Sequence, residues 1–232
     1  MKDKVVVITG AAGNLGRAVA KAFAERGARL ALIDLQPEAL AAAFGADNER
    51  QMLVAANLTK ADVADAAALA VLARFGRIDA LCNLAGGFRM GTPVHDTDAK
   101  TWEFLFGLNF HTVQHMAHAV VPQMLKQGSG KIVNIGAFSA QRGLAQMGAY
   151  IASKSAVIRI TESMAAELRD KGINVNCVLP TIIDTPENRA DMPDADPEKW
   201  VAPGDLAEVI AFLASDAARA VHGAALPVTG LS

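Results

Sequence analysis

VVVITGAAGNLG, residues 5–16, places a glycine-rich loop directly after a short apolar run. The run is typical of a buried strand, and the segment RAVAKAFAERG after the loop has a helical pattern. Gly10, Gly13 and Gly16 therefore occur in the strand–loop–helix order that a dinucleotide fingerprint requires. Glycines let the backbone approach a pyrophosphate closely, and the helix N-terminus offers it free N–H groups. The stretch predicts a dinucleotide site; a glycine-rich turn that binds nothing is the alternative.

Segments of strand type and helix type alternate along the chain. We expect strands near 4–9, 29–33, 51–56, 79–84, 130–136, 173–179 and 224–229, and helices near 14–26, 37–44, 60–75, 98–126, 148–171 and 203–214. Short apolar strands between longer helices indicate βαβ units. The predicted fold class is α/β: a Rossmann-type doubly wound parallel sheet with helices on both faces, formed by a single domain over residues 1–232.

The second predicted strand, RLALID, ends at Asp34. A carboxylate at this position can accept hydrogen bonds from a ribose 2′-OH and would repel a 2′-phosphate. Asp34 therefore favours NAD(H) over NADP(H), with NADP(H) still possible. The alternative is that Asp34 is a turn or capping residue ahead of the helix that starts near Pro37.

The stretch TPENRADMPDADPEKW, residues 185–200, is irregular and follows the end of a predicted strand. Ligands of doubly wound sheets bind beyond the carboxyl ends of the strands. A long loop at that edge is a candidate substrate lid. Trp200, its last residue, is expected either to line the lid or to anchor it.

Tyr150 and Lys154 lie four residues apart in AYIASK, within the predicted helix 148–171. Side chains at this spacing share one helix face. A nearby cation favours the phenolate and lowers the pKa of a phenol, so the pair is a plausible device for proton transfer. Taken alone, such a pair more often means a packed ring and a solvated amine.

The composition argues against several classes of protein. Apolar residues make up 52% of the 232 residues, but no apolar run approaches the roughly 18 residues of a membrane span. The net charge is −2 with both signs scattered, so no basic surface for nucleic acid is expected. Cys82 and Cys177 lie in apolar runs, which indicates buried thiols in a reducing compartment. The first strand begins near Lys4, so we expect no targeting peptide and a cytoplasmic location.

His111, His115 and His118 fall at i, i+4 and i+7 of the predicted helix 98–126. This spacing can present metal ligands on one face. No supporting carboxylate lies nearby in the sequence, so we expect a packed or interface face and no metal.

TGAAGNLG, Asp34, LCNLAGG, Asn109 and YIASK together resemble the short-chain dehydrogenase/reductase family over nearly the whole chain. The resemblance implies a nicotinamide cofactor and hydride transfer. Tyr150 would donate or accept the proton, Lys154 would bind the nicotinamide ribose and lower the pKa of Tyr150, and Asn109 would hold a water in the proton path. Besides Asp34, Tyr150 and Lys154, the resemblance implies as cofactor-binding residues Gly10, Gly13, Asn14, Leu15, Gly16, Asn57, Leu58, Asn83, Ala85, Gly86, Pro180, Ile183 and Thr185.

Two positions depart from the family pattern. Asn14 occupies the middle glycine of TGxxxGxG, and Ala137 occupies the place of the catalytic serine, thirteen residues before Tyr150. Ser139 lies two residues further on, and we expect that it does not substitute. Losing a donor that stabilises negative charge on the substrate oxygen typically costs about 10²–10³ in rate.

Alanine in place of the serine is also a feature of the dihydropteridine reductase branch of the family. LCNLAGGF and GAFSAQRGLAQMGAY are similar to that branch, although Asn109 departs from it. This likeness implies a quinonoid dihydropterin as acceptor, on which Phe88 would stack. Together with Ala137, Ser139 and Trp200, Phe88 forms the set of candidate substrate residues.

The sequence therefore predicts an NADH-preferring oxidoreductase that acts either on a dihydropterin-like heterocycle or on an ordinary carbonyl/alcohol pair. A non-catalytic dinucleotide-binding protein is the alternative from another class. Helices 98–126 and 148–171 carry apolar residues on more than one stripe, and the resemblance implies that they pair with their copies across a two-fold axis. We expect a homodimer or homotetramer with a small-molecule substrate, and no nucleic-acid or membrane partner.

Overall fold

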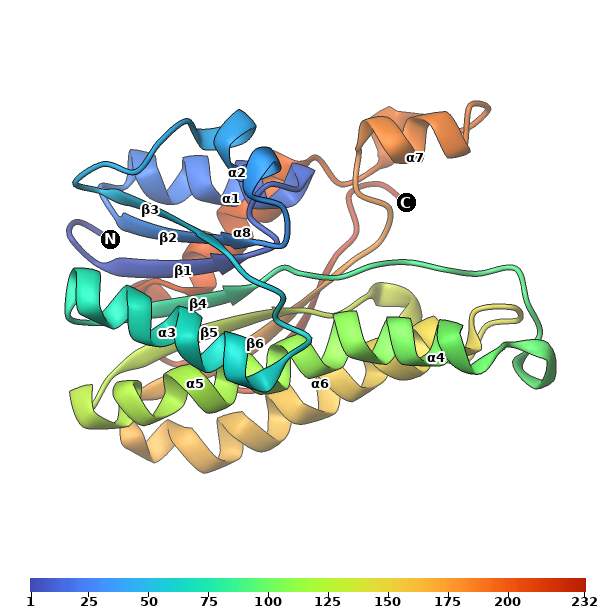
Figure 1. Ribbon diagram of the computed structural model, residues 1–232. Coiled ribbons are helices and arrows are strands. Elements are labelled where there is room, and N and C mark those ends of the chain that lie inside the picture. Colours follow the sequence, from blue (N-terminus) through green and yellow to red (C-terminus); the bar gives the residue numbers. More distant parts are fainter.

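A sheet of seven parallel strands forms the centre of the protein, whose computed structural model describes residues 1–232 (Figure 1). The strands are β1 (Val5–Thr9), β2 (Arg29–Asp34), β3 (Gln51–Ala55), β4 (Ala80–Asn83), β5 (Gly130–Ile135), β6 (Ile173–Pro180) and β7 (Ala225–Val228). Their order is β3-β2-β1-β4-β5-β6-β7, with every neighbouring pair parallel. The predicted Rossmann-type fold is confirmed.

Helices cover both faces of this sheet (Figure 1). They are α1 (Asn14–Glu25), α2 (Pro37–Phe44), α3 (Ala61–Phe75), α4 (Ala99–Phe106), α5 (Thr112–Gln127), α6 (Gly148–Leu168), α7 (Pro186–Asp191) and α8 (Pro203–Leu213). One core lies between the sheet and α1 and α8, and a second lies between the sheet and α3, α5 and α6. Because both faces are covered, β1 and β6 are buried along their whole lengths.

The structure differs from the predicted elements in two segments. The expected helix 98–126 is divided by a π-helical turn at Gly107–His111, between α4 and α5. The stretch 185–200, expected to be irregular, contains α7 and a 3₁₀ turn at Pro197–Lys199. Thr185 caps α7 by accepting a hydrogen bond from the Asn188 N–H, and Pro186 suits the first helical position.

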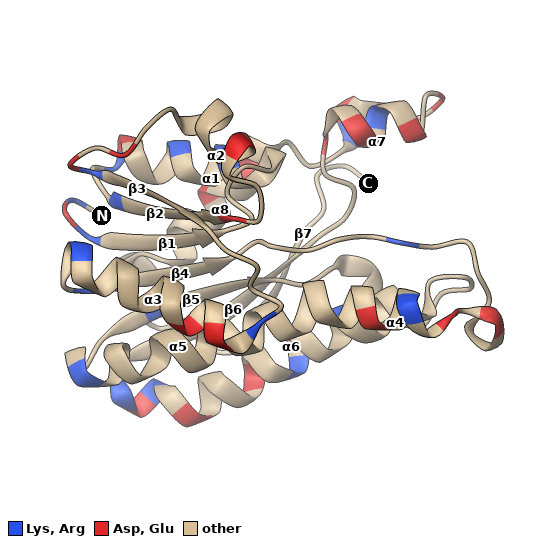
Figure 2. Ribbon diagram, in the orientation of Figure 1, with Lys and Arg blue, Asp and Glu red and all other residues tan.

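Basic and acidic residues are both scattered over the fold, and α7 carries both (Figure 2). Cys82 on β4 and Cys177 on β6 are free, buried thiols, as predicted, and burial raises the pKa of each to about 12. None of the helices combines the length and the apolar character that crossing a membrane requires.

Candidate active site

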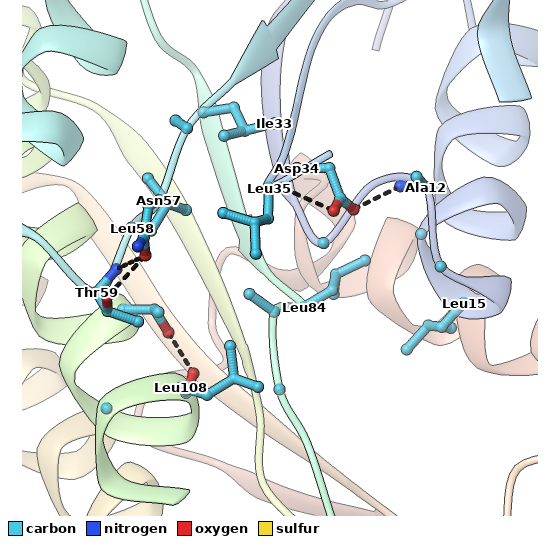
Figure 3. Close-up of a pocket in the computed structure, with 18 of the residues that line it drawn as sticks. Ala12, Leu15, Ile33, Asp34, Leu35, Asn57, Leu58, Thr59, Leu84 and Leu108 are labelled. Atoms are coloured by element: carbon cyan, nitrogen blue, oxygen red, sulfur yellow. Dashed lines mark hydrogen bonds between the residues drawn. The ribbon is translucent and has the colours of Figure 1, made fainter. Parts of the chain in front are cut away.

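A cavity of about 930 Å³ opens beyond the carboxyl ends of β1, β2, β3 and β4 (Figure 3). Most of the predicted cofactor residues line it: Gly10, Gly13, Asn14, Leu15, Gly16, Asp34, Asn57, Leu58, Ala85, Gly86, Ile183 and Thr185. The sequence did not indicate that Lys100, Glu103 and Phe104 of α4 would form another part of its wall. No motif marks these three residues, because only the folded position of α4 brings them to the cavity.

The glycine loop is fixed by close backbone packing. Gly10 has φ +63°, and a Cβ on it would lie 2.9 Å from the backbone of Ala85. A Cβ on Gly16 would overlap the carbonyl oxygen of Gly10. At Gly13, by contrast, a Cβ would be 3.4 Å from that oxygen, an ordinary contact. Gly10 and Gly16 are therefore required for the loop to lie against β4 and α1, whereas Gly13 is not required for packing.

Asp34 holds the neighbouring backbone at the edge of the cavity (Figure 3). Its carboxylate accepts hydrogen bonds from the N–H groups of Ala12 at 2.9 Å and Leu35 at 2.7 Å. Ala12 belongs to the glycine loop, so the end of β2 is tied directly to the loop after β1. Lys100 is the only lysine or arginine among the residues that line the cavity.

Tyr150 lies in the first turn of α6 and is half-buried. Its ring contacts Phe88 edge-on, with ring centroids 4.8 Å apart and planes at 84°. It also packs against an apolar cluster that contains Ala137. Burial raises the pKa of Tyr150 to about 12. The phenol is therefore protonated at neutral pH.

Lys154 is buried one turn further along α6, with 5% of its surface exposed. Its Nζ donates a hydrogen bond to the Ile135 carbonyl oxygen at 2.8 Å. Burial lowers the pKa of Lys154 to about 8. The sequence predicted that Lys154 would lower the pKa of Tyr150. In the structure burial raises the pKa of Tyr150, and the lowering by Lys154 stays a prediction.

Asn109 lies in the π-helical turn and is fully buried. Its side chain pairs with the backbone of Gly87, accepting from the N–H at 2.8 Å and donating to the carbonyl at 3.1 Å. It also donates to Ser153 Oγ at 3.0 Å, and Ser153 donates to the Tyr150 carbonyl at 2.7 Å. Ser153 was not predicted; its position directly before Lys154 is the only sequence signal.

Gly86 lies where the cavity wall adjoins the side chains of Asn109 and Lys154. A Cβ on Gly86 would lie 3.1 Å from Asn109 Oδ1 and 3.2 Å from Lys154 Nζ, and Gly86 itself lines the cavity. The amine and the amide therefore meet the cavity at the loop after β4. A glycine at this position leaves the space between them open.

Four predicted cofactor residues do not line the cavity: Asn83, Tyr150, Lys154 and Pro180. Asn83 is buried at the end of β4 and donates to Asn134 Oδ1 at 2.9 Å, and Asn134 donates to Thr161 at 2.9 Å. This chain of hydrogen bonds ties β4, β5 and α6 together beneath the site. The Asn83 Oδ1 atom has no hydrogen-bond partner. Pro180 is the last residue of β6.

The tentative substrate residues are placed differently from one another. Phe88 is exposed beside Tyr150, and Ala137 is buried in the cluster against which Tyr150 packs. Ser139 is half-buried in a 3₁₀ turn at Phe138–Gln141, and Trp200 is buried at the far end of the 185–200 segment. Neither Ser139 nor Trp200 lines the large cavity.

The histidines of α5 and the preceding turn do not converge on a metal site. His111 and His115 stack, with ring centroids 5.9 Å apart, and Nδ1 of His115 donates to the Leu58 carbonyl oxygen at 2.9 Å. No group of three or more His, Cys, Asp or Glu side chains is placed to hold a metal ion.

Comparison with known proteins identifies the family of the chain. The family model described as "short chain dehydrogenase" matches residues 4–196, and the chain belongs to that family. It is therefore an oxidoreductase of the short-chain type. The chain is 38% identical to D-threitol dehydrogenase of Mycolicibacterium smegmatis (strain ATCC 700084 / mc(2)155), over 99% of this chain and 93% of the relative. Other relatives are also named as dehydrogenases or reductases, so the particular likeness to dihydropteridine reductase gains no support.

Solved structures share the fold and bind both kinds of cofactor. An NAD⁺-bound xylitol dehydrogenase is 28% identical with a TM-score of 0.90, covering 99% of this chain and 98% of that one. ElxO with NADP bound is 25% identical with a TM-score of 0.90, over 99% and 98% of the two chains. A nicotinamide dinucleotide is thus the cofactor type of this family.

Proposed function

We propose that the protein transfers a hydride between NAD(H) and the carbon of an alcohol/carbonyl pair in a small molecule, with Tyr150 as proton donor or acceptor. The observation that carries the proposal is the arrangement around Gly86, where Lys154 and Asn109 adjoin the cavity that holds Asp34 and the glycine loop. Residues from five separate segments line or adjoin this one cavity. Such convergence of a proton-transfer group with a dinucleotide-type cavity has a direct catalytic use.

The polar groups at the cavity wall support a nicotinamide dinucleotide as its occupant. The loop from Gly10 to Gly13 leads into α1, whose N-terminal N–H groups suit a pyrophosphate. Asp34 provides a carboxylate for ribose hydroxyls, and no arginine lines the cavity to bind a 2′-phosphate. These features support a preference for NAD(H) over NADP(H). When bound, the cofactor supplies or accepts the hydride.

The proton path begins at the Tyr150 hydroxyl. With a pKa of about 12 this phenol holds its proton at neutral pH, so it can donate that proton to a carbonyl oxygen during reduction. In the reverse direction Tyr150 must first lose its proton. Lys154, whose pKa is about 8, binds the nicotinamide ribose in this proposal. Asn109 bonds to the backbone of Gly87 and to the side chain of Ser153, and through Ser153 it holds the start of α6. In this proposal Asn109 also holds the water of the proton path.

The substrate is proposed to be a small secondary alcohol or its ketone. Support comes from the names of the relatives, which include D-threitol dehydrogenase and levodione reductase. A quinonoid dihydropterin is the second candidate. Ala137 favours it, because no hydroxyl stands there to stabilise an alkoxide, and so does the exposed Phe88 beside Tyr150.

Turnover assays on the purified protein test this proposal. NADH absorbance is followed with polyols and NAD⁺, and with ketones or a quinonoid dihydropterin and NADH. Tyr150→Phe is expected to lower kcat by about 10²–10⁴ and to leave the NADH Kd nearly unchanged, since it removes a proton donor and little packing area. Wild-type turnover in Tyr150→Phe would refute the role of Tyr150. NADH binding without turnover on any acceptor would favour the non-catalytic alternative.

The chain is proposed to assemble as a homodimer or homotetramer. Trp102, Phe106 and Phe110 form a half-exposed row along α4 and the π-helical turn, with successive ring centroids 6.1 and 6.4 Å apart. Such a row is costly to leave in water, so a second copy is expected to cover it. Light scattering should give at least twice the 24.3 kDa of one chain; a monomer mass at micromolar concentration would contradict this.

The buried free thiols support a cytoplasmic location.

A further inference from the structure

The helix α7 is held to the body of the protein by one side-chain hydrogen bond. Asn14 Nδ2 donates to Glu187 Oε2 at 2.8 Å, joining residues 173 positions apart. No residue of α7 is buried, and α7 packs extensively against no other helix or strand. Its remaining bonds are to its own base, where Arg189 pairs with Asp184 and Asn188 donates to the Ile183 carbonyl.

Asn14 and Glu187 come from two separate segments that both reach the cavity. Asn14 begins α1 directly after the glycine loop and lines the cavity, and Ile183 and Thr185 line it at the base of α7. The two ends of the segment that carries α7 are joined by an isolated bridge, in which Asp184 N–H donates to Val201 and Val201 N–H donates to Ile182. The Asn14–Glu187 bond therefore closes a bridge from α7 to the glycine loop.

A third residue strengthens this bridge. Arg17, one turn along α1, donates to Asn14 Oδ1 at 2.6 Å. Arg17 thus holds the Asn14 amide by its oxygen while the amide nitrogen donates to Glu187. The pKa of Glu187 is lowered by hydrogen bonds from its own backbone, Thr185 and Asn14, and by the charge of Arg17. All three side chains are wholly or partly exposed, so the bridge is weak enough to open and close.

We propose that Asn14 and Glu187 are a pair of positioning residues that hold α7 against the glycine loop and so slow the release of the bound dinucleotide. This inference rests on the proposed function, because the glycine loop is where the pyrophosphate would lie. It also gives Asn14 a use: this side chain stands where the family pattern has a glycine, which could not make the bond. Holding α7 also positions Ile183 and Thr185 at the cavity wall.

Displacement of NADH by excess NAD⁺, followed by NADH fluorescence in a stopped-flow instrument, tests the pair. Asn14→Gly and Glu187→Ala are each expected to raise the NADH dissociation rate about three- to tenfold. The double variant should be no faster than the faster single variant, because both changes break one bond. Glu187→Gln keeps an oxygen that can accept from Asn14 and should stay close to wild type.

Asp191→Ala is the matched control. Asp191 is an exposed acid on the same short helix and makes no hydrogen bond through its side chain. Removing it changes the charge of α7 and leaves the bridge intact, so the rate should be that of wild type. An equal effect of Asp191→Ala and Glu187→Ala, or additive effects of Asn14→Gly and Glu187→Ala, would overturn the proposal.

Limited trypsin digestion of the cofactor-free protein supplies a readout that does not need NADH. Arg189 lies in α7, and cleavage after it should be faster in Asn14→Gly and Glu187→Ala than in wild type and Asp191→Ala. Unchanged cleavage in both variants would refute the bridge. Failure of the wild-type protein to bind NADH would instead refute the proposed function, so the two failures are distinguishable.

Discussion

The glycine-loop side and the substrate side of the candidate site are held in place in different ways. On the glycine-loop side, β1, β2 and the loop between Gly10 and Gly16 are linked by backbone packing and by the hydrogen bond from Ala12 to Asp34. On the substrate side, α7 has no buried residue, and one side-chain hydrogen bond, from Asn14 to Glu187, joins it to the glycine-loop side. In our proposal the first arrangement would fix the position of the cofactor, while the second would let α7 move.

If the glycine-loop side is the rigid one, the substitution with the largest effect on stability and cofactor affinity should be at Gly16. A Cβ there would overlap the Gly10 carbonyl, so Gly16→Ala must displace the loop. We expect a loss of about 3 kcal/mol in unfolding free energy and a large loss of NADH affinity. Gly13→Ala is the control, since its Cβ has 3.4 Å of clearance and should change both quantities little. Chemical denaturation and NADH titration measure them, and equal effects of the two variants would show that the loop is not rigid.

A smaller effect is expected at Ala137, on the substrate side. Ala137→Ser restores a hydroxyl next to the cluster that packs on Tyr150, at a φ of −155° that any residue adopts. One added donor to a developing alkoxide is worth roughly 2–4 kcal/mol at best, so ketone reduction should rise tenfold or more. Reduction of a dihydropterin should not rise. The kcat/KM values on the two acceptors decide this.

Ser139→Ala is the companion variant. Ser139 makes no hydrogen bond through its side chain and does not line the large cavity, so the variant should keep wild-type activity. Severe loss of ketone reduction in Ser139→Ala would show that this serine already fills the role and that Ala137 is not the missing position.

The smallest effect concerns cofactor choice. Asp34→Asn removes the negative charge that opposes a 2′-phosphate, and the amide oxygen can still accept from Ala12. The preference for NADH over NADPH should fall by about tenfold, which corresponds to about 1.4 kcal/mol. Dissociation constants for the two cofactors check this. Tighter binding of NADPH than NADH by the wild type would mean that a cation, such as Lys100, compensates for Asp34.

The same contrast explains what the sequence can predict. The apolar runs of β1, β2 and β6 define buried strands regardless of context, so these strands were predictable. Gly10, Gly16 and Asp34 act through backbone geometry at strand ends, so their positions were predictable too. The helix α7 was missed because PENRAD carries capping residues without an apolar face. The π-helical turn was missed because it depends on Asn109 bonding to the distant Gly87. The raised pKa of Tyr150 depends on how deeply the ring is buried, which no spacing reveals.

Tyr150 is the single tyrosine of the chain, so its ionisation can be followed without overlap by the near-ultraviolet absorbance of phenolate. This titration, with and without NAD⁺, tests most directly whether Tyr150 is the proton-transfer group of a nicotinamide site. Without NAD⁺ the pKa should be about 12, so almost no phenolate is present up to pH 10. The positive charge of the nicotinamide ring favours phenolate, so NAD⁺ should lower the pKa of Tyr150. A pKa that saturating NAD⁺ leaves unchanged would contradict the account.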